Sequence, residues 1–275
     1  MNKSIATAGL IAMVAIASPS LLAQWKSYPS AGVPRLPNGE PNLTAPAPRT
    51  ADGKPDLSGL WRGGAPAAPA GQPAAPAAAA ASAGPPLATF RDVGANLKEG
   101  LPLTPWGADV LKQRKADNSK DNPEAHCLPM GIVQFHTQGA PRKFYQTPGA
   151  LIILYEASSG VRQIFTDGRP LPDDDPQPWW YGYSTGKWEG DTLVVQTTGF
   201  RDDGWLDIWG TPLTSTGKVT ERFHRVNFGR MDIDITVEDP KAYTKPWTVR
   251  SVQQIMVDTE LIEFICLENQ RFGQQ

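Results

Sequence analysis

Strict alternation of apolar and polar side chains is the feature that most constrains the fold of this chain. From Met231 to Glu238 every odd position is apolar, and every even position is charged or hydroxylated. Successive side chains of a β-strand point to opposite faces of the sheet. The pattern therefore predicts a strand with one face in a core and the other in water.

Further strands are predicted through the second half of the chain. They are the apolar or β-branched segments Leu151–Tyr155, Leu193–Thr198, Trp247–Met256 and Leu261–Leu267. Short turn sequences separate them, among them Pro148-Gly149, Glu189-Gly190-Asp191 and Phe228-Gly229. Short turns favour antiparallel pairing, and closing the sheet removes its exposed edges. We predict a mainly β fold, an antiparallel up-and-down (lipocalin-like) barrel of about 8–10 strands over residues 121–270. A β-sandwich is the alternative.

Composition divides the part of the chain that precedes this barrel. Residues 24–55 are rich in Pro and Gly with no hydrophobic period, which predicts an extended arm, and residues 56–62 predict a first strand. Residues 63–88 are nearly all Ala, Pro and Gly, and their repeated prolines predict a disordered insertion. A helix is predicted over 104–118, because Thr104 can cap it and Pro105 suits its first turn.

The first 23 residues predict export. Lys3 gives a short basic start, Ile5–Ala17 is apolar, and small residues follow up to Ala23. This run is too short to span a bilayer, so it is read as a signal peptide with cleavage after Ala23; an earlier site after Ala17 is the alternative. We expect a periplasmic or secreted protein with no stable membrane insertion after cleavage.

Two cysteines, Cys127 and Cys266, remain in the exported chain. In an oxidising compartment such a pair usually forms a disulfide, with two buried free thiols as the alternative. Neither the cysteines nor the three histidines show the spacing of metal ligands. We therefore expect no metal and no cofactor.

Charge and motifs exclude several classes of function. The formal net charge is −2 with no cluster of Lys or Arg, which argues against a nucleic-acid partner. The sequence also lacks a Gly-x-Ser-x-Gly elbow, a Gly-rich phosphate loop and a dinucleotide-binding fingerprint. These absences count against a familiar hydrolase or cofactor enzyme.

Aromatic and acidic residues gather between residues 162 and 209. Large aromatic rings beside short carboxylates are typical of a pocket that binds a polar, ring-shaped molecule by stacking and hydrogen bonding. The alternative is that the rings fill a β core while the aspartates, Asp173 to Asp175 included, occupy turns. The candidate ligand-binding residues are Arg162, Trp180, Tyr183, Asp203, Trp205, Asp207 and Trp209.

The segment from Val219 to Val226 carries charge on both faces, which is unusual for a half-buried strand. We expect some of its polar residues to face inward and line a cavity; a surface ladder of salt bridges is the alternative. Arg222 and His224 are added to the candidate site on this basis, with Glu221 and Arg225 as further candidates.

Several motifs resemble a family of secreted, uncharacterised bacterial proteins that is frequent in acidobacteria. The resemblance covers most of residues 121 to 270. It is carried by Gln163–Arg169, Trp180–Ser184, Gly186–Leu193, Glu221–Phe223, Asp239–Trp247 and Ile265–Asn269. The family has no established activity, so the resemblance implies export and kinship but no reaction. Many members have histidines where this chain has Leu213 and Lys218. If those histidines are catalytic residues or metal ligands in the relatives, this chain is a variant that lacks them.

Two tripeptides, Gly59-Leu60-Trp61 and Gly186-Lys187-Trp188, also resemble the Gly-x-Trp of lipocalin first strands. From all these features we predict an exported barrel that binds a small ring-containing ligand, a sugar or an aromatic metabolite. One alternative is a carbohydrate-active hydrolase or lyase that uses loop carboxylates. Another is a structural protein of the cell envelope.

Overall fold

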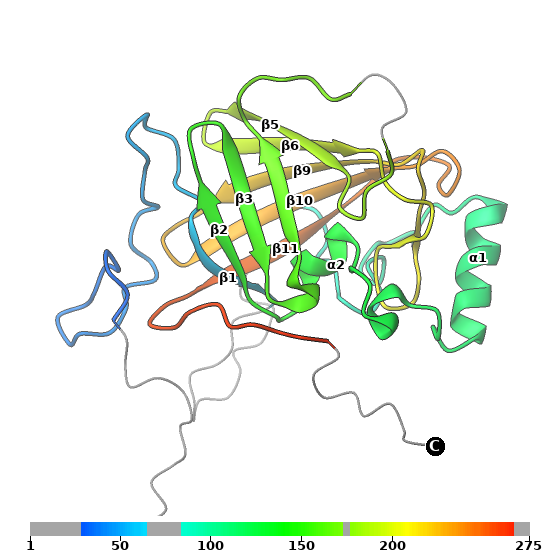
Figure 1. Cartoon of the computed structure of the whole chain (residues 1–275), viewed down its shortest axis with the longest axis horizontal. Coiled ribbons are helices and arrows are strands. Elements are labelled where there is room, and N and C mark those ends of the chain that lie inside the picture. The colour runs from blue at the N-terminus through cyan, green and yellow to red at the C-terminus, as the bar shows by residue number, and fades with distance from the viewer. Residues whose placement is uncertain (1–28, 65–83, 173–176, 267–275) are drawn as a thin grey trace, which may run out of the picture.

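The computed structural model describes residues 29–64, 84–172 and 177–266 (Figure 1). The signal segment, most of the Ala/Pro-rich insertion and Asp173 to Asp175 lie outside the described residues. The expectations for those segments stay predictions.

Nine strands of the described chain close into one barrel, in the order β1-β11-β10-β9-β6-β5-β4-β3-β2. The strands are β1 (Gly59–Gly63), β2 (Arg142–Gln146), β3 (Ala150–Tyr155), β4 (Val161–Phe165), β5 (Tyr183–Glu189), β6 (Thr192–Thr198), β9 (Lys218–Arg225), β10 (Arg230–Glu238) and β11 (Trp247–Met256). The predicted mainly β barrel is confirmed. The predicted turns join β2 to β3, β5 to β6 and β9 to β10.

One strand pair departs from the up-and-down pattern. β4 and β5 pair in parallel, with Ile164 opposite Ser184 and Phe165 opposite Thr185. A tight turn forces antiparallel pairing, whereas a parallel neighbour needs a longer crossover. The long excursion between Phe165 and Tyr183 supplies that crossover, so β5 starts at the same end of the barrel as β4.

The barrel is closed by a strand from far outside the main β region. β1 begins at Gly59, three residues after the predicted start, and pairs with both β2 and β11. This closure leaves β11 no free edge. The predicted strand over Leu261–Leu267 is accordingly wrong for its described part, where residues 261–266 form no strand.

The two α-helices of the described residues lie on one side of the barrel (Figure 1). α1 spans Pro105–Ala116, within the range predicted for a helix, and its Gly107 amide donates to Thr104 Oγ1 at 3.1 Å. α2 (Ile132–Thr137) lies against β1 and β11. The remaining short elements are the 3-10 turns η2 (Pro123–His126) and η3 (Ala157–Ser159) and the strand pair β7 (Gly204–Trp205) and β8 (Pro212–Leu213).

Large apolar side chains fill the middle of the barrel. Each strand contributes alternate residues to this core, as the period of a strand requires. Fully buried members include Phe144, Leu151, Ile153, Ile164, Leu193, Val195, Phe223, Ile233, Ile235 and Val249.

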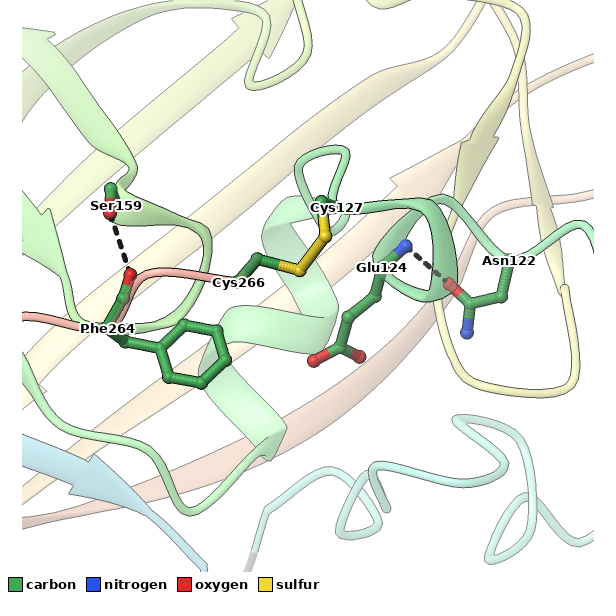
Figure 2. Close-up of a disulfide and its surroundings, with 6 residues drawn as sticks. All are labelled: Asn122, Glu124, Cys127, Ser159, Phe264 and Cys266. Carbon is green, nitrogen blue, oxygen red and sulfur yellow. Dashed lines mark hydrogen bonds between the residues drawn. A yellow bond between two sulfur atoms is a disulfide. The ribbon is translucent and has the colours of Figure 1, made fainter. Parts of the chain in front are cut away.

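Cys127 and Cys266 form the predicted disulfide (Figure 2). Their Cα atoms are 5.7 Å apart, and 139 positions separate them in the sequence. The bond joins the residue after η2 to the tail that follows β11. Ser159 Oγ also donates to the Phe264 carbonyl at 3.0 Å, which holds the same tail beside η3. The chain that leads into α2 is therefore tied covalently to the C-terminal side of the barrel.

Candidate functional site

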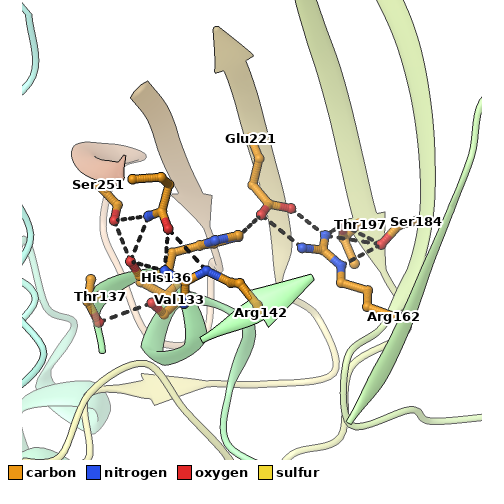
Figure 3. Close-up of polar contacts among 10 residues, drawn as sticks. Val133, His136, Thr137, Arg142, Arg162, Ser184, Thr197, Glu221 and Ser251 are labelled. Carbon is orange, nitrogen blue, oxygen red and sulfur yellow. Dashed lines mark hydrogen bonds and ion pairs between the residues drawn. The ribbon is translucent and has the colours of Figure 1, made fainter. Parts of the chain in front are cut away.

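A buried cluster of charged residues joins α2 to the barrel wall (Figure 3). Glu221 on β9 accepts hydrogen bonds from Arg162 on β4, at 2.9 Å from Nη1, and makes a 2.6 Å contact with His136 Nε2. All three side chains are at most 1% exposed. Arg162 also donates to Ser184 Oγ and Thr197 Oγ1, so the cluster connects four strands and a helix.

A second set of bonds fixes the end of α2. Arg142 Nε donates to Gln253 Oε1 at 3.0 Å, and Gln253 Nε2 donates to the His136 carbonyl at 2.8 Å. Ser251 Oγ donates to the same carbonyl at 2.6 Å. These side chains come from β2 and β11. Together the two sets hold α2 across one end of the barrel.

Burial and pairing set the charges in this cluster. Burial would raise the pKa of Glu221, but the charge and hydrogen bonds of Arg162, together with the hydrogen bond of His136, outweigh it and lower that pKa to about 2. Burial lowers the pKa of His136, although its bond to Glu221 opposes the shift. Burial also lowers the pKa of Arg142 to about 10, which leaves the guanidinium charged at neutral pH. The cluster therefore contains two cations, one anion and a neutral imidazole.

The neutral imidazole has a defined tautomer. An ionised carboxylate only accepts hydrogen bonds, so His136 must donate its Nε2–H to Glu221. Its Nδ1 is then a bare acceptor, and neither this atom nor Arg142 Nη1 has a partner among the described residues. A carboxylate that orients a histidine is also the arrangement of a general base. Here, however, the imidazole is 0% exposed, so a substrate from solvent has no path to it while α2 stays in place.

The alternation of β9 places its four candidate residues on two opposite faces of the strand. Glu221 and Arg225 are buried, whereas Arg222 and His224 are exposed on the outer face. Arg222 pairs with Glu189 at 3.0 Å in the exposed layer. The expectation that polar residues of this strand face inward thus applies to Glu221 and Arg225, and the structure places Arg222 and His224 on the side away from the interior.

The excursion between β6 and β9 packs as a small structural unit. Trp205 is 3% exposed and lies under the Arg114 guanidinium, 4.7 Å from the ring centroid. Asp207 is fully buried and accepts bonds from the amides of Val93 and Thr211 and from Thr211 Oγ1, at 2.6–3.0 Å. Burial raises the pKa of Asp207, opposed by these bonds.

The remaining candidate residues of this excursion, Trp209 and Asp203, also contact nearby cationic side chains. Trp209 is contacted by Arg91 and Lys115, whose cationic groups each lie 5.7 Å from the ring centroid. Asp203 is exposed and pairs with Arg201 at 3.0 Å. None of these contacts involves the barrel interior. The excursion packs against α1 and the segment before it, and its Trp205 carbonyl also lies against Gly131 at the start of α2.

Trp180 and Tyr183 lie near the start of β5. Trp180 is covered by the Arg201 guanidinium at 4.6 Å, and Tyr183 packs against Phe165 and Trp179 at 5.4 and 6.2 Å between centroids. Within the described residues no ring pair joins any two of the four predicted rings, Trp180, Tyr183, Trp205 and Trp209. The predicted ring cluster is therefore not held together by contacts between these four rings.

The end of the barrel opposite α2 is hollowed, and we call this hollow the barrel mouth. Its volume is about 370 Å³. Leu151 and Leu193 form its apolar floor, and Trp188, at the end of β5, forms one wall. The rim is built by the β2–β3 turn, by Thr166 and by the arm, and includes Thr50, Ala51, Asp52, Gln146, Thr147, Pro148 and Ala150.

Defined contacts hold the arm at this mouth. Arg49 pairs with Asp191 in the β5–β6 turn at 2.6 Å. The Leu57 amide donates to Gln146 Oε1 at 2.8 Å, and Thr50 Oγ1 donates to Asp52 at 2.5 Å. That hydrogen bond lowers the pKa of Asp52, so its carboxylate is ionised at the rim. In Figure 1 the arm, drawn in blue, runs beside the β2–β3 and β5–β6 turns while α2 lies at the other end.

Sequence reasoning did not select Trp188, Leu151 or Leu193 as site residues. A signal for Trp188 existed, because it is the last inward position of β5 before the Glu189-Gly190 turn. A large ring at the end of a barrel strand lies at an opening by geometry alone.

The described residues contain no group of three or more His, Cys, Asp or Glu side chains placed to hold a metal ion. No helix in the described ranges is long and apolar enough to cross a membrane. Comparisons of the chain with protein-family models, with curated proteins and with solved structures find no match.

Proposed function

We propose that this protein is an exported β-barrel protein that binds a small ring-containing ligand, a sugar or an aromatic metabolite, at the barrel mouth. The observation that carries the proposal is the hollow of about 370 Å³ in which Trp188 stands beside Leu151 and Leu193. Ligand sites are concave, largely apolar and equipped with a few polar groups, and this volume is in their usual range.

The chemistry of the mouth suits a ring with polar substituents. The Trp188 face offers apolar area and a polarised surface for stacking. Hydroxyl, amide and carboxylate groups at the rim, from Thr50, Asp52, Gln146 and Thr147, can accept or donate hydrogen bonds to ring substituents. The Cys127–Cys266 disulfide supports export, because such bonds persist in oxidising compartments.

Binding is favoured over glycoside hydrolysis by the state of the excursion carboxylates. Hydrolysis needs a pair of carboxylates that face one substrate. Asp207 is buried in structural bonds, Asp203 pairs with Arg201, and Asp202 accepts from the Ser215 amide and hydroxyl. The filled middle of the barrel would also suit a structural envelope protein, which is the outcome if no ring compound binds.

The test is titration calorimetry on the mature chain with a panel of monosaccharides, disaccharides, phenols and aromatic carboxylates. For the compounds that bind, Trp188→Ala should weaken affinity at least tenfold, or about 1.4 kcal/mol. Ala51→Trp should also block binding, because Ala51 is an exposed rim residue whose enlargement fills the mouth.

The matched control is Trp106→Ala, which removes a ring that is 40% exposed on α1 and does not line the mouth. Binding that survives both Trp188→Ala and Ala51→Trp would contradict the proposal. So would the absence of binding across the panel.

A further inference from the structure

A second hollow adjoins the barrel mouth on the outside of the barrel, and we call it the outer groove. Its volume is about 830 Å³. It lies between the loop of residues 168–171 and the outer surface of β5 and β6, and its lining includes Arg169, Leu171, Thr185, Lys187, Glu189 and Gln196. Thr166 and Trp188 line both the groove and the mouth. The two hollows therefore adjoin at Thr166 and Trp188.

The wall of the outer groove is held in place. Arg169 stacks on Phe165, with its guanidinium carbon 3.9 Å from the ring centroid, and pairs with Asp167 at 2.6 Å. Pro170 follows directly and fixes the backbone of the loop. A groove whose wall is ordered before binding loses less conformational entropy when a ligand enters.

The floor of the groove carries hydrogen-bonding side chains, and among them Lys187 is a cation without an ion-pair partner in the described residues. Thr185 lies opposite Gln196 and Lys187 opposite Val194 in the β5–β6 register. All four occupy outward positions, since the alternate residues Ser184, Leu193 and Val195 are buried. Glu189 is paired with Arg222, so the groove has no strong excess of one charge. Such a surface suits a neutral ligand that is rich in hydroxyl groups.

We propose that the ligand is a neutral oligosaccharide, with one sugar ring in the barrel mouth and the following rings running past Trp188 into the outer groove. This inference rests on the proposed function and specifies its ligand. A single-ring metabolite would fill only the mouth and would give no role to the groove. A chain of sugar rings supplies both an apolar ring face for Trp188 and a row of hydroxyls for Thr185, Lys187 and Gln196.

The test compares oligomers of different length. Calorimetry is run with β-1,4-linked glucose, α-1,4-linked glucose and β-1,4-linked xylose oligomers of one to six rings. For at least one series, affinity should rise at least tenfold between the shortest oligomer that binds and the longest. The Lys187→Ala/Gln196→Ala variant should weaken the longest oligomer at least fivefold, and Ala51→Trp should abolish its binding.

The control variant is Thr236→Ala/Thr248→Ala, which removes a hydrogen-bonded polar pair from β10 and β11, outside both hollows. Its affinities should equal those of the natural chain. The melting temperature of each variant checks that the fold persists, because the altered groove side chains are exposed or half-buried.

Three outcomes would overturn the inference: no oligomer binds, affinity does not depend on length, or the groove variant binds the longest oligomer as tightly as the natural chain. The inference then fails separately from the proposed function. Aromatic metabolites or single sugars that bind and depend on Trp188 would leave the mouth as a ligand site while removing the oligosaccharide.

Discussion

His136 and Glu221 meet at 2.6 Å inside the barrel, although 85 positions separate them in the sequence. The bond joins a six-residue helix to the middle of β9 at a place that water does not reach. Arg162 completes the pairing of the carboxylate. A buried charge that loses its partner is costly, so this arrangement makes the position of α2 sensitive to any change at Glu221.

We therefore expect Glu221→Leu to lower the free energy of unfolding by about 3–5 kcal/mol, because it leaves the Arg162 charge buried and unpaired. Adding Arg162→Met removes that charge and should restore at least about 1 kcal/mol. Urea unfolding followed by circular dichroism measures both values.

The matched control is the exposed pair of Arg222, which lies next to Glu221 on β9, and Glu189 at the end of β5. Changing it to Met and Leu should alter stability by less than about 1 kcal/mol, as for exposed ion pairs in general. A double variant at Arg162 and Glu221 that is no more stable than Glu221→Leu alone would contradict the account of the cluster.

Stability should also fall in acid. The ordinary pKa of histidine, 6.5, is lowered at His136 by burial, which outweighs the opposing bond to Glu221. The unfolded chain then binds a proton that the folded protein does not, so stability is lost as the pH falls below about 6.5. Glu221, with a pKa lowered from 4.5 to about 2, adds a second loss between those two values. Arg142 and Arg162 face the same imidazole and further oppose its protonation.

His136→Gln isolates the histidine part, since glutamine keeps an amide donor for Glu221 but does not titrate. Between pH 6.5 and 5 the natural chain should lose up to about 1.4 kcal/mol per pH unit more than this variant. Urea unfolding at half-unit steps of pH gives the comparison. Equal pH slopes in the two proteins would show that His136 is not buried in the neutral form.

The disulfide should contribute a large share of stability. The chain-entropy model gives about 4–5 kcal/mol for a loop as long as the 139 positions between Cys127 and Cys266. The variant Cys127→Ser/Cys266→Ser should lose about that amount in urea unfolding. Thiol titration of the denatured, unreduced natural chain should find no free thiol; two thiols would contradict the pairing.

Local pattern predicted much of this fold. The alternation from Met231 to Glu238, the turn at Glu189-Gly190 and the capping Thr104 each act within a few residues, so the sequence reveals them directly. The inward direction of Glu221 also follows from the alternation of its strand. Its partners do not, because Arg162 and His136 reach it only when the barrel closes.

The candidate site was harder to predict for the same reason. Trp188, Leu151 and Asp52 share the barrel mouth because the register of β3, β5 and the arm brings them together. The spacing of these three residues in the sequence does not predict that they lie close together. The composition of the ring-rich excursion instead predicted a ligand site there. In the structure its Trp205 packs under Arg114 and has a structural role.

Two aspartates of that excursion provide a direct comparison of structural and surface roles. Asp207 is fully buried and satisfies the amides of Val93 and Thr211, whereas Asp203 is exposed and pairs only with Arg201. Asp207→Ala leaves two buried amides without acceptors, each of which costs about 1–3 kcal/mol. We expect Asp207→Ala to lower the free energy of unfolding by about 2 kcal/mol or more, and Asp203→Ala by less than about 0.5 kcal/mol.

Binding measurements on the same two variants separate this role from a functional one. Because neither aspartate lines the barrel mouth, both variants should bind any ligand of the natural chain with unchanged affinity below their melting temperatures. A folded Asp207→Ala protein that has lost ligand binding would place Asp207 in the site and move the ligand from the mouth to the excursion. Unchanged affinity together with lowered stability would assign Asp207 to the framework that holds the excursion against the barrel.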